Sequence, residues 1–307
     1  MTFPHKNLLG LRFLSAEDIT TILDQAHSFK DLFNRPIKQV PTLRGKTIVQ
    51  LFFEPSTRTH ASFEMAIKLM GAGGLTLNVQ NSSVKKGESI RDTIQNLQAM
   101  GIDAVIVRHQ NGGVPHFMTQ HLSIPVINAG DGFTEHPTQG LLDIFTMREK
   151  LGDLKNKRVL IWGDILHSRV ARSNIWGLTK LGAEVYVGGP PTLMPAGIEE
   201  LGVKIVKDFD LAIEAMDVLN VLRIQHERQD IGYIPTTHEY KTYFGISESR
   251  IQKAKPNLLI MHPGPINRGI EIESNVADGP KSVILEQVTN GIAVRMATLY
   301  LLLTGAQ

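Results

Sequence analysis

The chain has no cysteine among its 307 residues, which excludes disulfide bonds and thiolate chemistry. No apolar run approaches the roughly 20 residues that a membrane-spanning helix needs. The first residues lack the basic and apolar regions of a secretory signal. We therefore expect a cytoplasmic protein without a membrane partner. The formal net charge is only +2, so the chain lacks a bulk positive field for nucleic acid, and any anion site must depend on a few well-placed arginines.

Several cofactor and hydrolase motifs are also absent. No Gly-x-Gly-x-x-Gly follows a predicted strand, because Val159–Asp164 has only one glycine in place, and this disfavours an NAD-dependent dehydrogenase. Neither a phosphate-binding Gly-x-x-x-x-Gly-Lys-Ser/Thr motif nor a Gly-x-Ser-x-Gly elbow occurs. The histidines lack His-x-x-x-His spacing, so we expect no metal. Together with the absent nucleotide motifs, this leads us to expect no cofactor.

Short apolar runs alternate with segments long enough for helices, and the length allows two domains of about 150 residues each. This pattern predicts an α/β fold of two domains, each a parallel β-sheet flanked by helices, linked by two interdomain helices. We expect the first domain to comprise residues 1–135 and 289–307, and the second residues 136–288. A helix over Pro137–Lys150 would join them. The expected strands are 47–53, 75–79, 104–107, 126–129, 158–162, 184–187, 203–206, 218–222 and 258–261.

One predicted turn combines the donors of a phosphate site. Residues 52–59 read Phe-Phe-Glu-Pro-Ser-Thr-Arg-Thr, after an apolar strand and before a helix with apolar positions at Phe63, Ala66, Ile67 and Met70. Such a turn offers backbone N–H groups, hydroxyls and a guanidinium at one point. The alternative is an ordinary helix cap at Ser56 beside an exposed arginine.

Ligands of parallel sheets bind beyond the carboxyl ends of the strands. Arginines and histidines gather at these ends, where the only acids are Glu54 and Asp164. We therefore expect a cleft for substrates with several negative charges. Glu54 is expected to pair with Arg169 and Arg228 and so to favour a closed cleft once both substrates are bound, and the alternative is a simple surface glutamate. The basic and polar segments are Ser56–Thr59, Arg108–His109, His136–Gln139, Ser168–Arg169, Arg223–Gln225 and His262–Pro265.

His136 is a candidate for polarising a carbonyl. Pro137 suits a first helical position, which places His136 and Gln139 on one face of the opening turn. The positive end of the helix dipole favours a neutral imidazole, which can still donate a hydrogen bond. The alternative is a structural histidine. The polar segment Gln80–Ser89 is either a solvated loop or a mobile lid for an anion.

Taken in order, these segments resemble the aspartate/ornithine carbamoyltransferase family. Residues 52–59 match its Phe-x-Glu-x-Ser-Thr-Arg-Thr signature without a departure, and the resemblance covers essentially the whole chain. Ornithine enzymes usually carry His-Cys-Leu-Pro where this chain has His262–Pro265, so the chain is more similar to the aspartate branch. The other matching segments include Ser82, Lys85–Glu88, Val107–His109, Gly163–Asp164 and Arg223–Gln225.

The resemblance implies transfer of the carbamoyl group of carbamoyl phosphate to the amine of L-aspartate, giving N-carbamoyl-L-aspartate and phosphate in pyrimidine biosynthesis. The first domain would bind carbamoyl phosphate and the second L-aspartate. The implied carbamoyl phosphate site is Ser56, Thr57, Arg58, Thr59, Arg108, His136 and Gln139 with the main chain of Gly264 and Pro265. The implied L-aspartate site is Lys86, Arg169, Arg223 and Gln225. The implied catalytic groups are Arg58, Thr59, Lys86, Arg108, His136 and Gln139.

The resemblance also implies an assembly. Ser82 and Lys86 would reach into the neighbouring subunit's site, which makes a homotrimer the minimum working unit. Whether regulatory chains or a dihydroorotase join the trimer stays open, and no cofactor is implied. Two other functions also stay open: a carbamoyltransferase for a different amine acceptor, and a non-catalytic anion-binding protein with the same fold.

Overall fold

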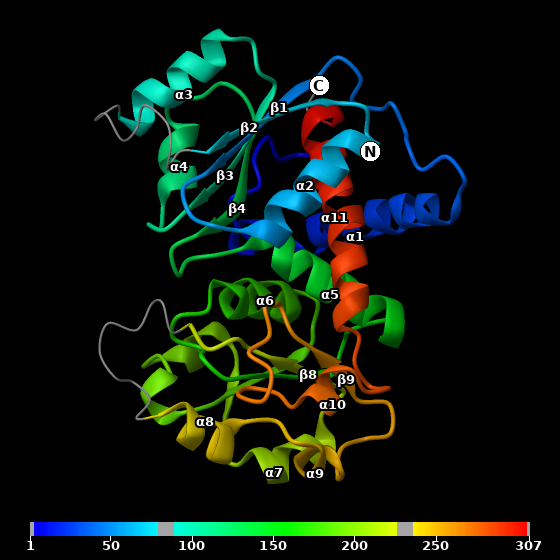
Figure 1. Ribbon diagram of the computed structural model, residues 1–307, viewed down its shortest axis with the longest axis vertical. Coiled ribbons are helices and arrows are strands. Elements are labelled where there is room, and N and C mark those ends of the chain that lie inside the picture. The colour runs from blue at the N-terminus through cyan, green and yellow to red at the C-terminus, as the bar shows by residue number, and fades with distance from the viewer. Residues whose placement is uncertain (1–2, 79–88, 226–235, 306–307) are drawn as a thin grey trace. The chain divides into compact units, whose positions relative to one another are not determined.

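The computed structural model describes residues 3–78, 89–225 and 236–305. It divides into two compact units, Met1–Leu142 with Thr289–Gln307, and Asp143–Val288. The chain leaves the first unit within α5 (Pro137–Leu151) and re-enters it within α11 (Ile284–Thr304). Two parallel-sheet units joined through two helices confirm the predicted fold class (Figure 1). The expected boundary at residue 135 and the assignment of one substrate to each domain stay predictions.

The first unit is built on a four-stranded parallel sheet with the order β2-β1-β3-β4. The central strands are buried on both faces, as near-continuous apolar runs such as that of β1 require. Each expected strand of the chain is present, with ends that differ by at most two residues, although residue 79 lies outside the described residues. The strands are β1 Thr47–Phe52, β2 Gly73–Asn78, β3 Ala104–His109 and β4 Val126–Asp131.

Helices cover both faces of this sheet (Figure 1). α3 and α4 pack through Leu97 and Met118 onto Val49 and Val107. On the other side lie α2 and α11, which are joined by a 2.8 Å hydrogen bond from Arg295 to Ser62 Oγ. The predicted start of the first helix is confirmed, since Ser15 and Asp18 form a capping box. The helices are α1 Ala16–Lys30, α2 Thr57–Leu69, α3 Ile90–Ala99 and α4 Val114–Thr119.

The second unit carries a five-stranded parallel sheet with the order β7-β6-β5-β8-β9. An apolar cluster packs Trp162 and Leu219 of the sheet against Phe209, Ile246 and Val276. The strands are β5 Arg158–Trp162, β6 Glu184–Gly188, β7 Lys204–Val206, β8 Val218–Val221 and β9 Leu259–Met261. The helices are α6 Arg169–Lys180, α7 Phe209–Ala212, α8 Thr237–Phe244, α9 Glu248–Ile251 and α10 Ser274–Ala277.

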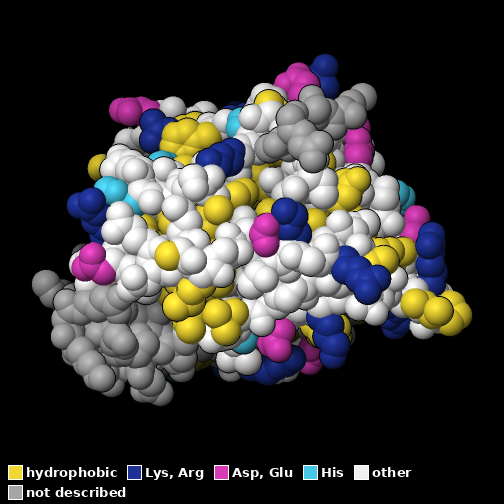
Figure 2. All heavy atoms as spheres, turned by 90° about the horizontal axis from the view of Figure 1, so that it is seen from above, with side chains coloured by type: hydrophobic (Ala, Val, Ile, Leu, Met, Phe, Trp, Pro, Cys, Tyr) yellow, Lys and Arg dark blue, Asp and Glu magenta, His cyan; other side chains and the backbone are white. Residues whose placement is uncertain are grey.

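The outer surface mixes charges of both signs. On the face drawn in Figure 2, Lys and Arg side chains are interspersed with Asp and Glu, and apolar side chains form small groups. This distribution agrees with the near balance of 32 basic and 30 acidic residues in the sequence. Within the described ranges, none of the helices combines the length and the hydropathy that crossing a membrane demands.

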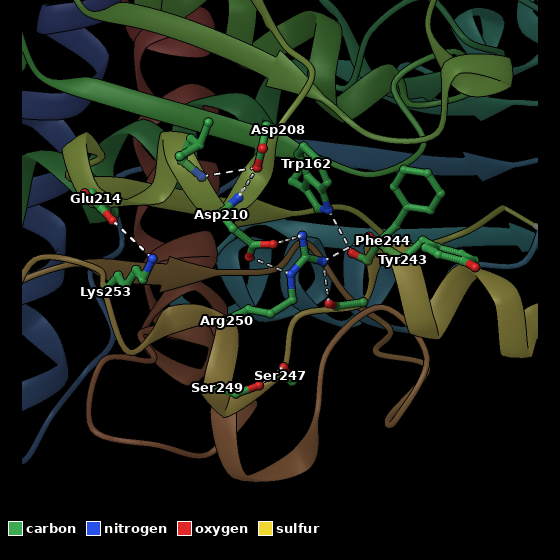
Figure 3. Close-up of polar contacts among 12 residues, drawn as sticks. Trp162, Asp208, Asp210, Glu214, Tyr243, Phe244, Ser247, Ser249, Arg250 and Lys253 are labelled. Atoms are coloured by element: carbon green, nitrogen blue, oxygen red, sulfur yellow. Dashed lines mark hydrogen bonds and ion pairs between the residues drawn. The ribbon is translucent and has the colours of Figure 1, made fainter.

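The C-terminal end of α8 is held by two side chains of the second unit (Figure 3). Trp162 Nε1 donates to Phe244 O at 2.8 Å. The Arg250 guanidinium donates to the carbonyls of Tyr243 and Gly245 at 3.1 and 3.0 Å, and it lies 4.4 Å from the centre of the Phe209 ring. These bonds satisfy carbonyl groups that a helix end leaves unpaired.

We expect Arg250→Ala to lower the free energy of unfolding by about 2 kcal/mol, through loss of two carbonyl hydrogen bonds and the ring contact. The partner carboxylate of Asp210 lies 3.0 Å from Arg250 Nε but is 57% exposed. Asp210→Ala should therefore cost below about 1 kcal/mol. Urea unfolding followed by circular dichroism measures both. If the two variants lost equal amounts of unfolding free energy, the Arg250–Asp210 ion pair, rather than the hydrogen bonds to the carbonyls, would hold the helix end.

Candidate active site

The predicted phosphate-binding turn connects β1 to α2. Ser56 occupies the N-cap position of α2, but its side chain makes no capping hydrogen bond. Thr57 and Arg58, the first two helical residues, are exposed. The Ser56 hydroxyl is thus not used by the helix, contrary to the ordinary-cap alternative. The turn instead presents a hydroxyl and a guanidinium at a helix N-terminus, an arrangement suited to phosphate.

Three polar side chains converge beside this turn, from the first turn of α2, from the end of β3 and from the segment that follows β4. Thr59 Oγ1 lies 3.5 Å from His136 Nε2, and Arg108 Nη1 lies 3.5 Å from each of these two atoms. Thr59 and His136 are 7% and 4% exposed, so the cluster is largely screened from water. The contacts exceed the usual 2.7–3.2 Å, so the groups hold one another only weakly. They can therefore turn their hydrogen bonds toward a substrate oxygen.

Arg108 is oriented by a carboxylate of its own unit. Its Nε donates to Glu54 Oε1 at 2.6 Å, and its Nη1 donates to Ala129 O at 3.3 Å. The sequence-based expectation did not include this Glu54–Arg108 pair. The expected pairs of Glu54 with Arg169 and Arg228 stay predictions, and Arg228 lies outside the described residues. The ion pair leaves the other edge of the Arg108 guanidinium directed at Thr59 and His136.

The turn that carries His136 is built from buried carboxylates. Glu135 accepts the backbone N–H groups of Leu11 and Arg12 at 2.8 and 3.1 Å, which ties the turn to the N-terminal segment. α5 begins at Pro137, as predicted, and Gln139 is 9% exposed. Gln139 N donates to His136 O at 2.9 Å. His136 and Gln139 therefore share the opening turn of the helix, which the spacing predicted.

His109 adds no positive charge to this edge of the sheet. Burial lowers the pKa of its imidazole, although the carboxylates of Glu54 and Asp131 partly offset that effect. Its Nδ1 accepts a hydrogen bond from Asn111 N at 2.9 Å, and its ring packs 4.7 Å from that of Phe53. Among the described residues, Arg58 and Arg108 are therefore the candidate cations of the first-unit site.

In the second unit, the loop after β5 presents Arg169. Gly163 has φ +128°, and a side chain there would meet Tyr240 and Leu222, so only glycine suits the position. Asp164, fully buried, accepts His167 N at 3.1 Å and lies 3.0 Å from His167 Nδ1. Sequence reasoning gave His167 no role, although the i, i+3 spacing after a strand end was a usable signal.

Arg169 is the first residue of α6 and is 4% exposed. Ser168 caps the helix by accepting Ala171 N at 3.1 Å. A guanidinium at the positive end of a helix combines two sources of positive potential, and an anion bound there would be stabilised by both. Burial lowers the pKa of the nearby Arg172, whereas the Asp164 carboxylate opposes this change.

The ends of β8 and β9 carry the other second-unit candidates. β8, β9 and β5 lie in one sheet with β8 between the other two, so their carboxyl ends form one edge. Arg223 and Gln225 follow β8 and are half-buried. Gly264, with φ +65°, and the exposed Pro265 follow β9 and are joined by a cis peptide bond. The structure thus brings these candidates to the same edge as Arg169.

Two predicted site residues, Ser82 and Lys86, lie outside the described residues, as does most of the expected lid segment. Within the described ranges, no group of three or more His, Asp or Glu residues could hold a metal ion.

The chain matches two family models in succession. Residues 6–149 match the carbamoyl-phosphate-binding domain of aspartate/ornithine carbamoyltransferases. Residues 155–302 match the aspartate/ornithine-binding domain of the same family.

Curated relatives agree with the family models. The aspartate carbamoyltransferase catalytic subunit of Carboxydothermus hydrogenoformans is 58% identical over 98% of this chain and 96% of its own length. That of Moorella thermoacetica is 56% identical over 100% of both chains.

Solved structures resemble the whole fold. Aspartate transcarbamoylase from Trypanosoma cruzi in complex with carbamoyl phosphate has a TM-score of 0.88 at 28% identity, covering 97% of this chain and 96% of that one. Ornithine carbamoyltransferase from Pyrococcus furiosus also has a TM-score of 0.88, at 30% identity over 100% of both chains. The chain therefore belongs to the aspartate/ornithine carbamoyltransferase family.

Proposed function

We propose that this chain is an aspartate carbamoyltransferase, which transfers the carbamoyl group of carbamoyl phosphate to the amine of L-aspartate in pyrimidine biosynthesis. The observation that carries the proposal is the convergence of Thr59, Arg108 and His136 beside the N-terminus of α2. Relatives named as aspartate carbamoyltransferase catalytic subunits are 52–58% identical to the chain. A cytoplasmic location is part of the proposal.

The reaction needs positioning and charge stabilisation more than covalent chemistry. The aspartate amine attacks the carbamoyl carbon, the bond from that carbon to the bridging oxygen breaks, and the nitrogen proton passes to the departing phosphate. Negative charge grows on the carbonyl oxygen and on the leaving group. Thr59, Arg108 and His136 donate to the carbonyl oxygen. Ser56, Thr57 and Arg58, with the helix N–H groups, hold the phosphate, and Gln139 completes the site.

Acceptor choice follows from charge in the second unit. Arg169 and Arg223 bind the two carboxylates of aspartate, with Gln225 beside them. Ornithine carries an ammonium where aspartate carries its second carboxylate, so two arginines favour aspartate and repel ornithine. Lys86 contributes to aspartate binding, and the Gly264 and Pro265 main chain contacts the carbamoyl amide.

A homotrimer with shared sites is the proposed working unit. The supporting observation is β2, an edge strand whose residues Gly73–Thr76 are exposed and whose Leu75 is 41% exposed. An exposed edge strand presents unpaired backbone groups with which another chain can pair. Ser82 and Lys86 follow this strand in sequence, so a subunit contact there would bring them to a neighbouring subunit's site.

Product formation with aspartate, ornithine and related amines tests the function. N-carbamoyl-L-aspartate should be the main product, and a bisubstrate phosphonate analogue should inhibit its formation. A preference for another amine would support the alternative acceptor. Binding of carbamoyl phosphate without turnover would support the non-catalytic alternative.

Hybrid trimers test the shared site. Arg58→Ala and Lys86→Ala subunits should each be nearly inactive alone, but mixed trimers contain some sites with neither substitution. Mixing by reversible dissociation should therefore restore a measurable fraction of activity, with light scattering to verify the trimer. Mixtures that recover nothing, although trimers form, would contradict sharing.

His136→Ala is expected to lower kcat about 100-fold with a smaller change in the KM for carbamoyl phosphate, because the imidazole donates mainly to charge that develops during the reaction. Steady-state kinetics at saturating aspartate measure this. His116→Ala is the control, since that histidine lies in α4 against Phe13. Near-normal turnover in His136→Ala would remove the assigned role.

A further inference from the structure

The loop after β9 is organised around a buried histidine–glutamate pair that the proposed reaction does not use. The His262 and Glu271 side chains are both fully buried, and His262 Nε2 lies 3.2 Å from Glu271 Oε1. His262 Nδ1 accepts the backbone N–H of Gly264 at 2.8 Å. Because a backbone N–H only donates, Nδ1 carries no proton, and the ring proton lies on Nε2 and points to Glu271.

The same carboxylate also holds the other end of the loop. Glu271 Oε1 accepts the backbone N–H of Asn267 in addition to the His262 proton. Among the described residues, Glu271 Oε2 has no hydrogen-bond partner. One oxygen atom of Glu271 thus fixes Gly264 through the imidazole and Asn267 directly. The segment between them, Pro265–Ile266, is therefore held at both ends.

The base of the loop is anchored separately. His262 N donates to Gln287 Oε1 at 3.0 Å, and Gln287 Nε2 donates to the buried Asp143 Oδ1 at 2.8 Å. Loss of Glu271 would therefore leave β9 and the His262 backbone in place. It would release the imidazole ring, and with it the orientation of the Gly264 N–H.

We propose that Glu271 is a positioning residue that acts through His262 to orient the Gly264–Pro265 main chain toward the carbamoyl amide. This inference rests on the proposed function, which assigns that amide to this main chain. A carboxylate buried in this way is costly unless it is hydrogen-bonded. The two hydrogen bonds that Glu271 Oε1 accepts, from His262 and from Asn267, both hold the loop after β9. The role concerns only the amide end of the substrate, and not its phosphate.

Acetyl phosphate separates the two ends, because it keeps the phosphate and the carbonyl but carries a methyl group in place of the amide. Glu271→Ala should raise the KM for carbamoyl phosphate about tenfold, the value of one oriented hydrogen bond, while the inhibition constant of acetyl phosphate changes by less than about twofold. Glu271→Gln keeps an oxygen acceptor at Oε1 and should restore most of the preference for carbamoyl phosphate.

A double-mutant cycle tests whether Glu271 acts through the His262 imidazole. His262→Asn places an oxygen near Nδ1, able to accept Gly264 N–H, but cannot reach Glu271. Adding Glu271→Ala to His262→Asn should then change the carbamoyl-to-acetyl preference by less than about twofold. Additive losses of preference would show that Glu271 acts independently of His262.

Asp217→Ala is the matched control, since this carboxylate accepts Arg158 N and Lys255 Nζ at the opposite, amino-terminal end of the same sheet. It should lower stability without changing the preference. If Glu271→Ala does not fold, Glu271→Met fills the space without an acceptor. A folded Ala or Met variant that keeps the wild-type preference, or weakens both ligands equally, overturns the proposal. Wild-type turnover with aspartate reports separately on the proposed function.

Discussion

Arg108→Ala is expected to lower kcat about a thousandfold, more than any other single change in the first unit. Arg108 directs one edge of its guanidinium at Thr59 and His136 and the other at Glu54. In the proposed mechanism, its removal takes away a charged donor to the developing oxyanion, which typically costs a factor of 10² to 10³. It also removes the Arg108 partner of the Glu54 carboxylate, which is 16% exposed.

Stability separates these two effects. Breaking a largely buried ion pair costs about 3 kcal/mol, because one charge stays buried without its partner. A Glu54→Gln/Arg108→Ala double variant removes that charge, so it should recover most of the lost unfolding free energy. It should also reverse part of any increase in the KM for carbamoyl phosphate, but kcat should stay low. Urea unfolding and steady-state kinetics on both variants measure this. Recovery of kcat in the double variant would mean that Arg108 only neutralises Glu54.

The fold was largely predictable because its signals are local. Each parallel strand reads as a short apolar run, and the caps at Ser15 and Pro137 are set by residues within one turn. Neighbouring strand ends of a parallel sheet lie at one edge, so grouping Arg108 with His136 followed from topology. The predicted strand ends were less accurate, since β3 continues two residues into the polar segment Arg108–His109 and β4 continues two residues to Asp131.

The supporting contacts of the site were not predictable in the same way. Glu54 and Arg108 are 54 residues apart, and Asp143 and Gln287 are 144 apart. Nothing in the spacing of such residues indicates that they meet, because their proximity is a product of the complete sheet order. Reasoning from charge alone therefore did not identify Arg108 as a partner of Glu54, and the expected pairs of Glu54 with Arg169 and Arg228 stay predictions. Sequence patterns identify groups that face a substrate more readily than the groups that hold them.

Arg223→Ala is expected to reduce kcat/KM for aspartate about 100- to 1,000-fold while leaving the KM for carbamoyl phosphate within about twofold. The side chain follows β8 at the same sheet edge as Arg169, and its loss leaves one aspartate carboxylate without a cation, a deficit of about 3–4 kcal/mol. Arg223→Lys should recover only part, because an ammonium cannot reproduce a bidentate contact. Arg268→Ala, at a surface pair with Asp278, is the control. Equal loss of both substrates would contradict the division of the two substrates between the units, since Arg223 would then serve carbamoyl phosphate as much as aspartate.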